Sequence, residues 1–175
     1  MTDAISTWLH VLAITIWIGP QVFLFAVAVP AVRTIEDARQ RARVMRTITE
    51  RFGWLAWSAM AVIVVTGVTN LLIVADNSGL SAGDLIDFGS DLRYARIFWE
   101  KMFFVALILG LTALHTFAIG PRQLRLMEDE IADEEAVRKA RRLSMIVSGA
   151  SLLASILALY MGAVLSNHDY SFVIE

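Results

Sequence analysis

The sequence predicts an all-α fold, an integral membrane four-helix bundle, and three observations lead to this prediction. Hydrophobic residues make up 57% of the 175 residues, a share that would leave a soluble domain with large apolar patches in water. Only 18% of the residues are charged. Four stretches contain no Asp, Glu, Lys or Arg, and each holds at least 20 residues. Because about 20 apolar residues span a hydrocarbon core of ~30 Å, each stretch is long enough to cross a membrane.

The uncharged stretches run from Ala4 to Val32, Phe52 to Ala75, Met102 to Pro121 and Leu143 to His168. We expect membrane helices over approximately residues 5–32, 52–75, 97–120 and 143–166, in a single domain that covers residues 1–175. The first stretch is expected to be a membrane helix rather than a cleaved signal peptide. Asp3 is the only charge before Arg33, and the apolar run is about twice the length of a typical signal-peptide core.

The loops between the predicted helices differ in charge. The first and third loops carry the basic residues Arg33, Arg39, Arg41, Arg43, Arg46 and Arg51, and Arg122, Arg125, Arg138, Lys139, Arg141 and Arg142. The middle loop carries Asp76, Asp84, Asp87 and Asp91 against Arg93 and Arg96. Since Lys and Arg favour the cytoplasmic side, we expect a multi-pass protein of the cell membrane with cytoplasmic basic loops and both termini outside. Both basic loops are rich in helix formers and are expected to be helical.

Composition excludes several classes of function. The chain has no cysteine, so disulfides, thiolate zinc sites and thiol catalysis are excluded. A net charge of −2 gives no bulk attraction to nucleic acid. No Gly-rich phosphate loop and no Gly-flanked nucleophilic Ser occurs. The lipid bilayer is therefore an expected partner, and a metal ion or haem, if bound, would need ligands other than cysteine.

Polar side chains within the predicted helices are the best candidates for function, because they are costly in hydrocarbon and tend to face protein or water. At ~1.5 Å per residue and with alternating helix direction, the candidates can be sorted by depth. The predicted outer pocket contains His10, Trp17, Gln21, Thr66, Asn70 and Lys101, with Met161 at a similar depth and His168 just above. His115 is ~20 Å deeper than Lys101 and would belong to a separate site.

Each candidate also has a purely structural explanation. His10 can form a hydrogen bond across the bundle, Lys101 can extend its ammonium to the interface, and Trp17 can be a core residue. The last helix has small residues at a spacing of four, namely Ala150, Ala154, Ala158 and Gly162. Such residues allow close approach of helices in lipid, either within the bundle or in a homodimer.

Short motifs recur along the four predicted helices. They comprise His10, Trp17, Gly19 and Pro30 in the first, Arg51, Phe52, Thr66 and Gly67 in the second, Lys101, His115, Pro121 and Arg122 in the third, and Arg141 and Arg142 before the fourth. In these motifs nearly the whole chain resembles the copper-resistance D (CopD) domain family and the related HemJ-type protoporphyrinogen oxidases. It departs from the HemJ type before the last helix, where RRLSM lacks the Asn-Glu part of that group's motif.

The resemblance implies copper binding or transport, with His10, Met161 and His168 near the outer face and His115 in a second site as candidate ligands. The alternative that it implies is a membrane redox protein that binds haem b, which would be an oxidoreductase if the protein is an enzyme. His10 would then be the axial ligand, and Arg93, Arg96 and Lys101 would pair with the propionates. A third reading is a non-catalytic accessory subunit. Copper and haem b remain open alternatives as the cofactor.

Overall fold

The structure, a computed structural model, describes residues 2–129 and 132–174. In chain order its elements are α1 (Thr2–Phe23), the π-helix η1 (Leu24–Ala28), α2 (Val29–Arg33), α3 (Ala38–Ser78), α4 (Ala82–Ile86), α5 (Arg93–Leu114), the π-helix η2 (His115–Ile119), α6 (Gly120–Glu128), α7 (Glu134–Ser166) and α8 (His168–Ser171). Four continuous helical rods, Thr2–Arg33, Ala38–Ser78, Arg93–Glu128 and Glu134–Ser166, are long and apolar enough to cross a membrane. The predicted all-α membrane bundle is confirmed.

The rods are longer than the uncharged stretches because both basic segments are helical, as expected. The Asp37 carboxylate caps α3 by accepting hydrogen bonds from the backbone N–H groups of Arg39 and Gln40, at 2.8 and 3.1 Å. The bonds from Gln40 and Arg39 also hold the pKa of the Asp37 carboxyl below its usual value. Asp133 caps α7 in the same way by accepting from the N–H of Glu135 at 3.2 Å.

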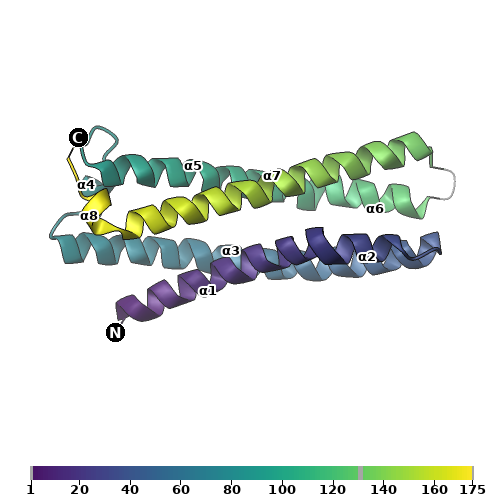
Figure 1. Cartoon of the computed structure of the whole chain (residues 1–175), viewed down its shortest axis with the longest axis horizontal. Helices are drawn as coiled ribbons and strands as arrows, with labels where there is room; N and C mark the ends of the chain where they lie inside the picture. The colour runs from purple at the N-terminus through teal and green to yellow at the C-terminus, as the bar shows by residue number, and fades with distance from the viewer. Residues whose placement is uncertain (1, 130–131, 175) are drawn as a thin grey trace.

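The four rods form two antiparallel pairs (Figure 1). The first pair consists of α1 packed on α3, and the second of α5 packed on α7. Both termini lie at one end of the bundle, together with α4 and α8, and we call this the terminal end. The C-terminal ends of α2 and α6 and the start of α7 lie at the opposite end, which carries the two basic segments and is called the arginine end.

Apolar packing is concentrated away from the arginine end. The central cluster contains Trp17, Ala56, Ala59, Met60, Ile108, Ala154 and Ala158, and the terminal cluster contains Ala75, Leu85, Tyr94, Ile97 and Leu165. Leu85 has an exposed fraction of 0%, so this residue of the turn-rich middle loop anchors α4 to the terminal cluster. Large apolar side chains such as Trp54 and Phe117 are exposed on the outside of the bundle, where a membrane would cover them.

Two five-residue π-helical segments, η1 and η2, interrupt the first and third rods. Each is followed directly by a short α-helix that has a proline in its first turn, Pro30 in α2 and Pro121 in α6. Proline cannot donate a backbone hydrogen bond, and its ring clashes with the carbonyl four residues earlier. A π segment widens the helix at this point and can relieve this clash at Pro30 and Pro121.

Gly120, which follows η2, donates its N–H to the carbonyl oxygen of His115. A Cβ atom at Gly120 would lie 3.0 Å from this oxygen, whereas a Cβ at Gly110 would meet nothing within 4 Å. We expect Gly120→Ala to lower the free energy of unfolding by about 1 kcal/mol or more. Gly110→Ala should raise it by about 0.5–1 kcal/mol, because alanine is the better helix former. Denaturant titration in detergent measures both values, and equal stability of the two variants would contradict the expected strain.

Candidate functional site

His10 is fixed on α1 by a hydrogen bond to α3. Its Nδ1 lies 2.8 Å from Oγ1 of Thr66. The Thr66 hydroxyl donates to the carbonyl oxygen of Val62 at 2.6 Å, so its oxygen accepts the hydrogen bond from His10. This assigns the proton of the imidazole to Nδ1 and leaves the lone pair on Nε2. Gly67 leaves room for the ring, since a Cβ there would lie 3.4 Å from Cε1 of His10.

A second hydrogen bond joins the same two helices one turn closer to the terminal end. The hydroxyl of Ser6 donates to Oδ1 of Asn70 at 2.6 Å. Ser6 and His10 are four residues apart on α1, as are Thr66 and Asn70 on α3, so the two bonds are stacked along one seam. They fix the register of α1 against α3 and with it the position of the His10 ring.

Lys101 brings a positive charge to this seam from α5. Its side chain lies against Gly162 of α7, where a Cβ would be 3.6 Å from Nζ. The ammonium is close enough to His10 to interact with it electrostatically. The structure therefore brings together five residues from three helices, which we call the His10 group: Ser6, His10, Thr66, Asn70 and Lys101.

Trp17 and Gln21, which the sequence places in the same pocket, lie further toward the arginine end. The indole N–H of Trp17 donates to Oγ of Ser155 at 2.9 Å, and Ser155 donates to the carbonyl oxygen of Ser151 at 2.8 Å. Trp17 is only 4% exposed and belongs to the central cluster. The amide of Gln21 donates to the carbonyl oxygen of Trp17 at 3.1 Å. The Trp17 ring thus separates Gln21 from the His10 group.

The other candidate residues have separate environments. Met161 packs against the terminal cluster, and the exposed His168 has its ring centroid 5.2 Å from that of Phe172. The guanidinium of Arg93 stacks over Tyr170 at 4.4 Å from the ring centroid, and Arg96 is exposed. Within residues 2–129 and 132–174, no group of three or more His, Cys, Asp or Glu side chains could hold a metal ion.

The small residues of the last helix are divided between the interior and the surface. Ala154 and Ala158 are buried in the central cluster of the chain's own bundle, and Gly162 lies against Lys101. Ala150 is exposed. Most of this stripe therefore packs within the chain.

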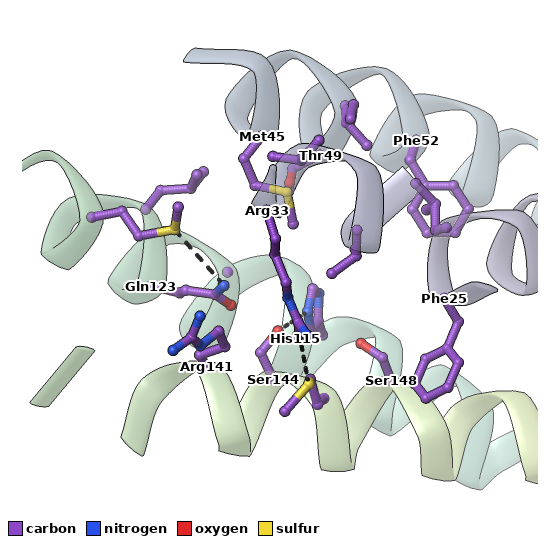
Figure 2. Close-up of a pocket in the computed structure, with 18 of the residues that line it drawn as sticks. Phe25, Arg33, Met45, Thr49, Phe52, His115, Gln123, Arg141, Ser144 and Ser148 are labelled. Atoms are coloured by element: carbon purple, nitrogen blue, oxygen red, sulfur yellow. Dashed lines mark hydrogen bonds between the residues drawn. The ribbon is translucent and has the colours of Figure 1, made fainter. Parts of the chain in front are cut away.

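His115 lies in a large cavity in the half of the bundle nearest the arginine end (Figure 2). The cavity has a volume of about 850 Å³ and is bordered by residues of η1, α2, α3, α6 and α7. His115 contributes from η2, and its Nε2 is 3.0 Å from Oγ of Ser144. Trp17 and Gln21 also border the cavity, on the side facing the central cluster. His10 is not among the lining residues, so His10 and His115 belong to different sites.

Sequence reasoning missed Ser6 and the cavity. Ser6 could have been found, because it continues the face of His10 at a spacing of four. The cavity gave no comparable signal, since its lining comes from every rod and depends on how far the two helix pairs separate.

Comparison with known protein families gives a match over most of the chain. The model of a family described as copper resistance protein D matches residues 46–161. The matched segment begins within α3 and ends near the end of α7, so α1 and His10 lie outside it. No curated protein and no solved structure matches the chain.

Proposed function

The chain belongs to the copper resistance protein D family, and from this premise we propose that it handles copper ions in the membrane, with His10 as a binding group for the ion. The observation that carries the proposal is the hydrogen bond of His10 Nδ1 to Thr66, which leaves the Nε2 lone pair for a metal. Histidine binds metals in this neutral form, and a hydrogen bond from its other nitrogen holds the ring in place.

The surroundings of His10 favour a passing ion over a resident one. The ammonium of Lys101 repels a cation held at His10. The contact between Trp17 and Ser155 places His10 level with Gly162 on the antiparallel α7, so Met161 is next to this level. Copper(I) accepts both imidazole and thioether ligands. Met161 packs against the terminal cluster, and its flexible side chain would have to rotate to join His10.

The proposed orientation follows from charge. The arginines are concentrated at one end of the bundle, and Lys and Arg favour the cytoplasmic side. With the arginine end on the cytoplasmic side of a cell membrane, both termini and the His10 group lie toward the outside of the cell. Copper from outside the cell would then meet His10 before it reached Trp17 and the central cluster.

Copper content of cells that express the protein tests the role of His10. We expect His10→Ala to abolish the copper-dependent difference between expressing and non-expressing cells, as measured by elemental mass spectrometry. Thr66→Val should reduce this difference about tenfold, because the imidazole loses the acceptor that orients it. His168→Ala is the matched control, since it removes an exposed histidine near the same end, and it should behave as wild type. Unchanged copper handling in His10→Ala would rule out the proposed role.

The absorption spectrum of the purified protein separates copper from the haem alternative. A Soret band that disappears in His10→Ala would indicate haem b at this histidine and a redox function instead. Colourless protein that retains copper in a His10-dependent manner would support the proposal. Colourless protein whose expression leaves the copper content of cells unchanged would indicate the accessory-subunit reading, with His10 serving only to join α1 to α3.

A further inference from the structure

The cavity at the arginine end has an apolar interior and a basic mouth. Its apolar walls include Trp17, Leu24, Phe25, Phe52 and Leu152. Among the described lining residues, its four arginines, Arg33, Arg41, Arg138 and Arg141, outnumber its two carboxylates, Asp129 and Glu134. A volume of about 850 Å³ lies within the range of ligand-binding cavities, roughly 300–1,000 Å³. Figure 2 shows Arg33 extending across the cavity toward α7, with His115 and Ser144 beside it. An occupant would therefore meet apolar walls inside and guanidinium groups at the mouth.

A second hollow of about 470 Å³ adjoins this mouth. Its lining is Arg33, Arg138, Arg141, Arg142 and Met145, all but Arg142 shared with the cavity. The lining contains four arginines and, among the described residues, no carboxylate. Arg33 donates to the thioether sulfur of Met145 at 3.3 Å, and a thioether is a weak acceptor. Four like charges around one hollow repel each other unless an anion lies between them.

The hollow faces the side of the bundle rather than its end. On one side of the cavity α3 packs against α6. Arg46 of α3 donates hydrogen bonds to the two carboxylate oxygens of Glu128 of α6, at 2.6 and 2.7 Å. Within the described residues, no comparable packing joins α2 to α7. The arginine-lined hollow lies between these two helices. The cavity thus opens sideways, at the depth where a membrane helix passes from hydrocarbon to headgroups.

We propose that the cavity binds one anionic phospholipid from the adjacent leaflet, with its phosphate in the arginine hollow and its acyl chains in the apolar cavity. Guanidinium groups form paired hydrogen bonds with phosphate, and basic pockets between membrane helices bind anionic headgroups. A soluble anion would leave the apolar walls bare. A zwitterionic lipid such as phosphatidylcholine brings its own cation beside its phosphate, so it gives the four arginines of the hollow no net counter-charge. The sideways opening gives a lipid direct access from the membrane.

Native mass spectrometry of delipidated protein in mild detergent tests this proposal. We expect one phosphatidylglycerol to bind per chain, roughly tenfold more tightly than phosphatidylcholine with the same acyl chains. The double substitution Arg33→Gln and Arg141→Gln should remove most of this preference. The matched control is Arg122→Gln with Arg125→Gln, which removes two exposed charges of α6 that do not line the cavity. This control should retain the preference to within about twofold.

A variant that keeps every arginine tests the apolar part of the site. Ser148→Phe places a ring inside the cavity, so phosphatidylglycerol binding should fall while melting in detergent remains close to wild type. Equal affinity for the two lipids, equal loss in both arginine double variants, or unchanged binding in Ser148→Phe would overturn the proposal. Displacement of the lipid by glycerophosphoglycerol or inorganic phosphate at equal concentration would also overturn it, because the site would then bind a soluble anion.

Discussion

Replacing Trp17 with alanine should lower the free energy of unfolding by about 3–5 kcal/mol, the largest loss that we expect from any single substitution in this chain. The Trp17 ring is 4% exposed, and it belongs to a central cluster that also contains residues from the other three rods. Its loss would extend the neighbouring cavity into this cluster, because Trp17 is also part of the cavity wall. Denaturant titration in detergent, followed by circular dichroism, measures the change.

Two further variants divide the contribution of Trp17 into packing and hydrogen bonding. Trp17→Phe keeps a ring but loses the N–H that donates to Ser155, and should cost about 1 kcal/mol beyond the smaller ring. Ser155 still donates to Ser151 in that variant, so no buried donor is left unpaired. Trp54→Ala is the control, since Trp54 is 81% exposed and should change stability by less than about 0.5 kcal/mol. A similar loss in Trp17→Ala and Trp54→Ala would contradict the assigned core role.

Enlarging Ala154 should also destabilise the bundle, by about 1–3 kcal/mol for Ala154→Leu. Ala154 is 3% exposed and lies in the central cluster, where α7 approaches the first helix pair closely. Extra methyl groups there must displace a neighbour or separate the rods. The measurement is the melting temperature in detergent together with the denaturant midpoint.

The matched control for Ala154 is Ala163→Leu, on the exposed face of the same helix. A leucine at position 163 faces lipid or detergent and should leave the melting temperature nearly unchanged. If both variants melted alike, α7 would not be packed through Ala154. Loss of a dimer without loss of stability in Ala154→Leu would instead assign the residue to an interface between chains.

The rods could be predicted because hydrophobic length and charge determine them directly. The uncharged stretch from Phe52 to Ala75 indicated a membrane helix, and helix-forming residues before it indicated that α3 extends further. The π segments were not predicted, although Pro30 and Pro121 were visible. A proline indicates a local disturbance of the helix, but a kink, a break or a wider turn can each accommodate it.

The candidate site was only partly predictable because helical spacing fixes which residues share a face but not which face meets which neighbour. Thr66 and Asn70 were placed on one face, yet the pairing of His10 with Thr66 and of Ser6 with Asn70 depends on the rotation of both helices. Trp17 shares the face of His10, but depth separates them, since seven residues correspond to ~10 Å along a helix. Leu85 illustrates the same limit, because an apolar residue in a loop can face the membrane or the bundle, and only the fold shows that Leu85 is buried.

The position of Trp17 between the His10 group and the cavity also bears on the proposed copper handling. A copper ion that moved from His10 toward the cavity would meet the indole of Trp17, which is buried and bonded to Ser155. Passage of the ion past Trp17 would require the indole to break its hydrogen bond to Ser155. Access from the outer side of the membrane and access from the cytoplasmic side would then be separate steps. If the protein transports copper, such a barrier favours alternating access over an open channel.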